Sequence, residues 1–552
     1  MESAAPPSRS EMFLYAGGIF LLTMLIYVFS LGNDFVFWDD PLLVTDNPIV
    51  YGLSIQNIHA AFTTFDPDLY VPLTTISFQV NYAIAGLDPF IYHLTNLLLH
   101  AGSAILTGAV AFRLSRTKTV ALIAALLFAV HPINVEAVAW VSSRKDLLSS
   151  FFFLLSLWSY LRFRDLSDKR WYGLSIVGFL LGLLSKVSVL PLPFILILSD
   201  LYTKRSINKR SLLLTVPFFF LSILFGIVSV FGKMGGQQTM FAKMLLGMKA
   251  IVFSLWHLVW PMQYSVVYPF TGDVSLMRMD ILLPLLAVFI LSVVTLIYRK
   301  KLPAVFFAWW WFLFLIAPSF LTAEKGRDVI SVLYLTSDRY VYLATIGIFF
   351  AAALLLNHLR NNYQIFTIAL VVILLFLAGW QALVWRNTET LLTHSLSLYP
   401  GVAIAHNNLG AYYDSIGKTD LAIAEYLAAA HSGVGTSDAW FNLGVVALRQ
   451  KQSADAIDAF TRAVELRPDY ALAQLNLGAL LLDAGQIQES VNHLLAAQKL
   501  EPGNISVYLN LGMALEKGND PVDAIRAYER VLQLDPENAF AKSRFEFLKR
   551  EQ

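Results

Sequence analysis

Two adjacent carboxylic acids, Asp39 and Asp40, follow the first long apolar segment of the chain, residues 12–31. Ionisable groups at a membrane boundary are costly to place there, so their presence suggests a function. A carboxylate in this position can take the proton of an attacking hydroxyl group. We therefore predict that residues 34–48 hold the chemical centre, with Asp39 and Asp40 as catalytic acids and Asp39 as the first choice of base.

Further acids and cations fall in segments that we expect at the same membrane face. A leaving phosphate needs fixed cations where its charge develops, and arginine offers a planar fork of donors whereas lysine is a point charge. A lipid-phosphate sugar donor requires such a set. No metal ion is needed, although carboxylates can hold a divalent cation. The predicted roles are catalysis for Glu136, donor-phosphate binding for Arg144, Lys186 and Arg339, and substrate contact for His131 and Asp338.

Each candidate also has a purely structural interpretation. The adjacent acids could begin a solvated helix, since charges at membrane ends are ordinary. His131 precedes a proline and could simply end a helix. Glu136 could pair with Arg144 or Lys145, and Arg339 could be an interfacial anchor whose charged end reaches water.

The elements that position these residues are predicted to be membrane helices. Of 552 residues, 57% are hydrophobic and 14% are charged, whereas soluble domains carry roughly 25% charged residues. The net charge of +1 gives no reason to expect a nucleic-acid partner, and the absence of cysteine excludes disulfides, thiolate metal sites and a cysteine nucleophile. With about 20 apolar residues per span, about eleven spans are expected: 12–31, 91–112, 119–133, 147–163, 172–185, 187–202, 212–231, 281–298, 303–321, 340–358 and 364–384.

Short basic connections predict the orientation of these spans. The connections at 113–118, 162–170, 204–210 and 299–301 are rich in lysine and arginine, which favours the cytoplasmic side and a cytoplasmic N-terminus. Residues 12–31 lack a small-residue cleavage site, so we expect a retained first span. To keep the alternation, residues 245–260 must not cross. The outer loop 33–90 then lies on the same side as the C-terminal part.

The C-terminal part is an internal repeat. Asn-Leu-Gly recurs at 408–410, 442–444, 476–478 and 510–512, always 34 residues apart. This period and pattern resemble the tetratricopeptide repeat, a pair of antiparallel helices. We predict a membrane domain at 1–385, a linker at 386–401 and an α-solenoid at 402–552, with residues 538–550 as a capping helix.

The asparagine of each Asn-Leu-Gly recurs on the first helix of its pair. Each amide offers donors and an acceptor to a peptide backbone. A ladder of asparagines could therefore bind an acceptor peptide, or it could hydrogen-bond from helix to helix within the stack. The four residues are Asn408, Asn442, Asn476 and Asn510.

Several motifs carry a family resemblance. The segment 37–40 with Asn47-Pro48 resembles the first outer loop of the transmembrane and tetratricopeptide-repeat O-mannosyltransferases. Residues 70–75 followed by 92–100, and 131–139 followed by Arg144, are similar matches. The resemblance implies an all-α, GT-C-like membrane domain whose acidic first loop supplies the base. It also implies transfer of a hexose, mannose in the family, from a polyprenyl or dolichyl phosphate to Ser or Thr of a protein.

The chain departs from this family at two positions. It has Val71 where the family often has arginine, and Val187 where the family has glutamate. We expect a bacterial relative in the inner membrane, with the repeats on the periplasmic side. The alternative is a non-catalytic membrane scaffold whose repeats recruit proteins. A transporter is disfavoured, because transporters usually show repeated halves with acids near the midplane.

Overall fold

A computed structural model describes residues 8–65, 69–205, 208–231, 238–322, 324–325, 332–358, 363–432 and 436–551. Contacts divide the chain into two units, Met1–Glu324 with Leu333–Leu398, and Lys325–Val332 with Tyr399–Gln552. The first unit is a bundle of apolar helices and the second is a set of paired helices. The predicted all-α architecture is confirmed, apart from three strands of two or three residues: β1 (Pro269–Phe270), β2 (Glu324–Lys325) and β3 (Val332–Tyr334).

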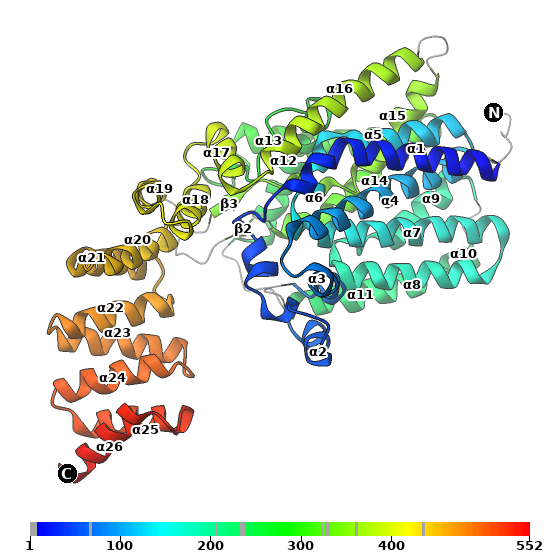
Figure 1. Cartoon of the computed structure of the whole chain (residues 1–552). Coiled ribbons are helices and arrows are strands. Elements are labelled where there is room, and N and C mark those ends of the chain that lie inside the picture. The colour runs from blue at the N-terminus through cyan, green and yellow to red at the C-terminus, as the bar shows by residue number, and fades with distance from the viewer. Residues whose placement is uncertain are drawn as a thin grey trace. The chain divides into compact units, whose positions relative to one another are not determined.

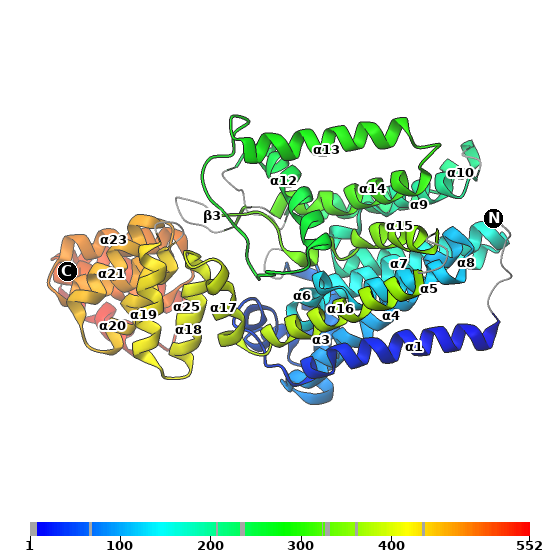
Figure 2. The same ribbon diagram turned by 90° about the horizontal axis from the view of Figure 1, so that it is seen from above.

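Long helices lying side by side form the first unit (Figures 1 and 2). The helices α2 and α3 lie in the first loop, between α1 and α4. Elsewhere in this unit, the strands β1 and β3 pair antiparallel, with Phe270 opposite Leu333. The helices are α1 (Arg9–Tyr27), α2 (Ile55–Thr63), α3 (Pro72–Ala85), α4 (Pro89–Ser115), α5 (Lys118–Val130), α6 (Val135–Ala139), α7 (Arg144–Leu166), α8 (Lys169–Ser185), α9 (Leu192–Tyr202), α10 (Lys209–Leu213), α11 (Val216–Phe231), α12 (Met240–Val259), α13 (Met279–Ile297), α14 (Pro303–Ile316), α15 (Thr345–His358), α16 (Tyr363–Val384) and α17 (Thr388–Leu398).

Helices α4 and α7 join two chemically different ends of this bundle. At one end, Arg144 Nη2 donates to the carbonyl oxygen of Tyr92 at 2.8 Å. At the other end, Arg113 Nη1 pairs with Asp165 at 2.6 Å. From Arg144 to Asp165 the helix rises roughly 30 Å at about 1.5 Å per residue. This length matches the hydrocarbon thickness of a bilayer, which is about 30 Å.

The second of these ends gathers three of the predicted basic connections, 113–118, 162–170 and 204–210. Asp165 accepts ion pairs from Arg113, Arg116 and Arg205, at 2.5–2.6 Å. Residues 206 and 207 of the predicted connection 204–210 lie outside the described residues. The convergence of three connections at one end agrees with their predicted location on one side of the membrane.

Fewer helices satisfy both the length and the apolarity of a span than the sequence predicted. Among the described residues seven do, or eight if the bent pair 118–130 and 132–139, with its 55° bend, counts as one. Turns shorten α8, α9 and α15, and α7 carries charges at both ends, so the predicted spans 147–163, 172–185, 187–202 and 340–358 are not among them. In contrast, α12 does qualify, although we expected residues 245–260 not to cross. The seven are 10–32, 89–115, 211–231, 240–259, 279–297, 303–322 and 364–384.

The predicted linker 386–401 is mostly the helix α17, which belongs to the first unit. The Thr388 hydroxyl accepts a hydrogen bond from the Phe37 backbone N–H at 2.8 Å, and the Arg386 carbonyl accepts one from the Asp34 N–H at 2.9 Å. The segment that leads to the repeats is thus hydrogen-bonded to the loop that carries Asp39 and Asp40. The short, mostly polar sequence of residues 386–401 gave no sign of this docking.

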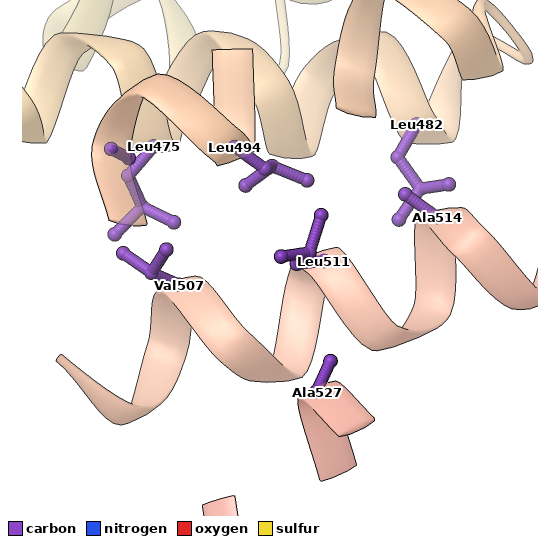
Figure 3. Packing of buried hydrophobic residues seen from close by; sticks show 8 residues of the cluster. Leu475, Leu482, Leu494, Val507, Leu511, Ala514 and Ala527 are labelled. Carbon is purple, nitrogen blue, oxygen red and sulfur yellow. The ribbon is translucent and has the colours of Figure 1, made fainter. Parts of the chain in front are cut away.

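The second unit contains the four predicted repeats, each a pair of packed helices, and a final helix. Its core between the third and fourth repeats is formed by residues such as Leu494, Val507 and Leu511 (Figure 3). The helices are α18 (Ala403–Ser415), α19 (Thr419–His431), α20 (Ser437–Arg449), α21 (Ser453–Leu466), α22 (Ala471–Asp483), α23 (Ile487–Leu500), α24 (Ile505–Lys517), α25 (Pro521–Leu534) and α26 (Ala539–Glu551).

The glycine of each Asn-Leu-Gly lies against a large side chain of the second helix of its repeat. A Cβ atom added there would lie 2.7 Å from the large side chain 16 positions later. No real Cβ contact is this short, so only glycine fits without movement. The four pairs are Gly410 with Tyr426, Gly444 with Phe460, Gly478 with Leu494, and Gly512 with Tyr528.

We expect Gly444→Ala to destabilise the repeats. Alanine favours a helix over glycine by about 1 kcal/mol, but overpacking against Phe460 costs about 1–3 kcal/mol, so the net change is a loss. Protease sensitivity of the repeats in the full-length chain measures it. Gly503→Ala is the control, because its added Cβ meets nothing within 4 Å. Equal protease resistance of the two variants would contradict the packing argument.

Candidate active site

Asp40, the second acid of the Asp39–Asp40 pair, is buried, and both of its carboxylate oxygens accept hydrogen bonds. Its Oδ2 accepts a hydrogen bond from the Val36 N–H at 2.9 Å, and its Oδ1 accepts the Ser142 N–H at 3.0 Å and hydroxyl at 2.5 Å. Burial raises the pKa of Asp40 to about 6, although these hydrogen bonds act in the opposite direction. Asp40 therefore joins the first loop to the segment between α6 and α7.

Asp39 is the open member of the pair. Its side chain is partly exposed, and no hydrogen bond to its carboxylate occurs within the part of the chain that the structure describes. Burial lowers the pKa of the Lys145 ammonium, and the nearby Asp39 charge opposes that change. The charge of Asp39 also acts on Arg339. Of the two acids, Asp39 is thus the one with an available carboxylate beside cations.

Glu136 and Arg339 form a buried ion pair across 203 positions of sequence. The Arg339 guanidinium donates to Glu136 Oε1, and the Arg339 backbone N–H donates to Oε2 at 3.2 Å. The guanidinium carbon also lies 4.8 Å from the ring centres of Trp140 and Tyr340. Neither Arg144 nor Lys145 pairs with Glu136, so that structural alternative is replaced by this pair.

Lys186 lies at the turn after α8 and is paired as well. Its ammonium donates to Asp146 Oδ1 at 2.5 Å and lies 5.4 Å from the ring centre of Tyr340. Both Lys186 and Arg339 therefore flank the same tyrosine. The outer segments 134–146, 186 and 338–340 meet here, as predicted.

Lys145 is a cation of the site that the sequence analysis did not select. Its side chain is 8% exposed, and its ammonium has no hydrogen-bond or ion partner among the described residues. The closest aromatic ring, Trp140, is centred 6.0 Å away. The only sequence signal was its position between Arg144 and Asp146.

Arg144 lies apart from this cluster. Its guanidinium donates to Asn96 Oδ1, to Asn81 Oδ1 at 2.9 Å and to the Tyr92 carbonyl at 2.8 Å, and it is fully buried. These acceptors come from α3 and α4, so Arg144 fastens the start of α7 to them. The structure does not place Arg144 where it was expected to meet a donor phosphate.

His131 and Asp338 are also occupied. The Nε2 of His131 contacts the Leu258 carbonyl at 3.0 Å, and its Nδ1 accepts a hydrogen bond from the Ile133 N–H at 3.2 Å. The second contact agrees with the structural interpretation, in which His131 ends a helix. Asp338 Oδ2 accepts the Tyr268 hydroxyl at 2.8 Å. Burial and the neighbouring Glu136 raise the pKa of Asp338 well above its usual range. Both residues support the walls of the site.

The asparagines of the repeats divide between the two interpretations. Asn442 donates across repeats to Asn407 at 3.0 Å, and Asn407 donates to Asn408 at 3.4 Å. Asn510 donates to the Ser506 carbonyl of its own helix at 2.8 Å. Asn476 has no hydrogen bond from its side chain among the described residues. The ladder is therefore partly internal, and all four amides are partly exposed.

The raised pKa of Asp40 predicts a pH dependence of stability. With a folded-state pKa of about 6 against an ordinary 3.8, the folded protein holds this proton longer than the unfolded chain. Stability from this group is complete below about pH 4 and is lost as the pH rises through about 6, by up to about 3 kcal/mol. Thermal midpoints of wild type and Asp40→Asn from pH 4 to pH 7 test this. Wild type should lose more stability than the variant, and parallel curves would contradict it.

Comparisons with known proteins agree with this architecture. Residues 93–231 match a family model described as dolichyl-phosphate-mannose-protein mannosyltransferase, and residues 407–471 and 505–538 match models of the tetratricopeptide repeat. A protein O-mannosyl-transferase of Xenopus laevis is 38% identical over 29% of this chain and 20% of that protein. One from Caenorhabditis elegans is 26% identical over 73% of this chain and 61% of that protein. The chain thus matches less than two thirds of these relatives.

A solved structure titled as a tetratricopeptide-repeat protein with an unusual peptide-binding site aligns at 21% identity and a TM-score of 0.25, over 30% of this chain and 81% of that chain. The family models and relatives support one class, a membrane glycosyltransferase followed by tetratricopeptide repeats. Within that class, the matched parts of the chain are similar to protein O-mannosyl-transferases and to tetratricopeptide repeats.

Proposed function

We propose that the chain transfers a hexose, mannose-like, from a polyprenyl-phosphate donor to Ser or Thr of a protein. One observation carries this proposal. The carboxylate of Asp39, which has no hydrogen-bond partner among the described residues, lies near two mostly buried cations, Lys145 and Arg339, and Lys186 lies beside Arg339 at the Tyr340 ring. A base beside fixed positive charge is what displacement of a phosphate by a hydroxyl requires.

The proposed reaction is a single displacement at the anomeric carbon. Asp39 accepts the proton of the acceptor's hydroxyl group. At the same time, the oxygen of that hydroxyl group forms a bond to the anomeric carbon. The bond from the carbon to the phosphate oxygen breaks, and its electron pair leaves with the phosphate. Lys186 and Arg339 stabilise the charge that develops on the phosphate. Atoms and charge balance without a further reactant.

The remaining acids act by positioning in this proposal. Asp40 holds the loop that carries Asp39 through Val36 and Ser142. Glu136 fixes the Arg339 guanidinium. The scheme requires no cofactor and no metal ion, and activity in the presence of a chelator tests the second point.

The repeats are proposed to hold the acceptor. Their partly exposed asparagines offer a peptide backbone both donors and acceptors, and Asn476 is the least engaged of the four. The family and the apolar helices support an integral membrane protein. A bacterial inner membrane, a cytoplasmic N-terminus and periplasmic repeats are parts of the proposal, supported by the basic end of the bundle.

Transfer of labelled hexose in membranes tests the proposed function. Membranes that contain the full chain should move label from polyprenyl phosphate to protein, in alkali-labile linkage to Ser or Thr, and membranes without it should not. Equal transfer with and without the chain, across mannose and other hexose donors, would contradict the proposal. That result together with specific protein capture would favour the scaffold alternative.

A further inference from the structure

A small pocket lies beside Ser142, the residue that binds Asp40. Its lining includes Val71, Thr74, Thr75, Ser142 and Lys145. Ser142 is the residue whose N–H and hydroxyl both bind Asp40. The pocket has room for about one water-sized group of atoms, which is also the size of one phosphate oxygen.

Among the described residues that line the pocket, Lys145 alone is charged. A mostly buried ammonium without a partner is costly, because its lost hydration is not replaced. Burial lowers the pKa of the Lys145 ammonium, and the positive charges of Lys186 and Arg339 act in the same direction. The negative charges of Asp39 and Asp146 raise this pKa. An anion that entered the pocket would supply the missing partner.

The lining hydroxyls are already oriented. Thr74 donates to the Ser185 carbonyl at 3.0 Å, Thr75 donates to the Val71 carbonyl at 3.3 Å, and Ser142 donates to Asp40. With their hydrogens committed, these hydroxyls present oxygen lone pairs and cannot serve as the main donors to an anion. Lys145, with three N–H donors, must provide them.

Val71 explains why this lysine is available. An arginine at position 71, which the resembling family often has, would place a second cation in the same small lining. Two cations there would repel each other and compete for one anion. In this chain the cation of the lining, Lys145, comes from α7, and the segment before α3 contributes the apolar Val71.

We propose that Lys145 and the pocket beside it form a subsite for a phosphate oxygen of the lipid-linked donor, with Lys145 in place of a cation at position 71. The inference rests on the proposed function for the identity of the ligand. Its chemical class is a phosphate ester, and the carrier lipid is distinguished from free phosphate by the probes used. Lys145 then contributes mainly to donor binding, so its loss should raise the donor KM more than it lowers kcat.

Binding of sugar-free polyprenyl phosphate to the purified full-length chain tests the subsite without any transfer reaction. We expect Lys145→Ala to weaken binding about tenfold or more, as for a lost charged hydrogen bond, and Lys145→Arg to retain most of it. The double variant Val71→Arg with Lys145→Ala should recover binding. Lys118→Ala is the control, because that ammonium pairs with Glu11 at the other end of the bundle.

Each result has one consequence. The subsite would be overturned if Lys145→Ala binds polyprenyl phosphate as tightly as wild type does. It would also be overturned if the double variant has the thermal midpoint of wild type but does not recover binding. Inorganic phosphate that competes as well as the lipid phosphate would overturn the lipid-linked ligand. Lys145-dependent binding in a chain that transfers no hexose would refute the proposed function and leave the subsite standing, so the two failures are separable.

Discussion

Asp39→Asn should lower the rate of hexose transfer by about 10²–10⁴-fold, the usual contribution of a general base. Asparagine keeps the shape of the side chain but cannot accept the hydroxyl proton. The partly exposed carboxylate has no hydrogen-bond partner among the described residues, so its replacement should leave the thermal midpoint unchanged. The loss should appear in kcat, with the donor KM close to that of wild type, because the cations that bind the phosphate remain.

Asp46→Asn is the matched control for this experiment. Asp46 lies on the same loop and is exposed. The Asp46→Asn variant should transfer hexose at nearly the wild-type rate. Both variants are compared with wild type at equal amounts of folded protein. An Asp39→Asn variant that retains full activity would exclude Asp39 as the base and would remove the main support for the proposed reaction.

Arg144→Met should destabilise the membrane unit by about 2–4 kcal/mol, through buried acceptors that lose their donors. Asn81, Asn96 and the Tyr92 carbonyl would all lose the guanidinium, which ties α7 to α3 and α4. Methionine has a similar length and fills much of the space, so the loss reports mainly on hydrogen bonding. The thermal midpoint of the purified full-length chain measures it.

Two comparisons separate this effect from a role in donor binding. Arg116→Met removes an arginine whose side chain is 47% exposed and whose partner Asp165 keeps two other arginines, and it should change stability by less than about 1 kcal/mol. The Arg144→Met protein that remains folded should bind polyprenyl phosphate as wild type does. A stable variant with weakened donor binding would return Arg144 to its originally predicted role.

The sequence predicted which loops come together at the candidate site, but it did not predict the role of each residue there. Charges at membrane ends and the alternation of spans indicate which loops share a face, and the loops that carry Asp39, Lys186 and Arg339 do meet. The 34-residue repeat was equally clear, because the same close helix contact demands glycine four times, as at Gly444 and Gly512.

Pairing between distant side chains could not be predicted in this way. Glu136 and Arg339 are 203 positions apart, and no local pattern distinguishes that pair from Glu136 with a nearby cation. Arg144 and Lys145 are neighbours on the first turn of α7, yet they point to different surroundings, because successive helical residues are rotated by about 100°. One is saturated by α3 and α4, and the other faces a pocket.

Fewer helices among the described residues have the length and apolarity of a span than the sequence predicted, for a related reason. Hydropathy reports how apolar a segment is, not where a turn interrupts it. The 3-10 turn at Asp338–Val341 leaves α15 with 14 residues, and the turn at Val187–Val189 separates α8 from α9. These same turns carry Asp338 and Arg339 and follow Lys186, so the interruptions that shorten the helices also place the charged groups of the site.

Photocrosslinking of the donor tests the central claim most directly, namely that the phosphate binds beside Asp39. A polyprenyl-phosphate hexose with a photoreactive group next to the phosphate would be bound to the full-length chain, irradiated and mapped by mass spectrometry. We predict adducts in residues 142–146, at Lys186 and at 338–340, reduced by excess unlabelled donor. Adducts confined to the opposite end, around Arg113, Arg116 and Arg205, would contradict the claim.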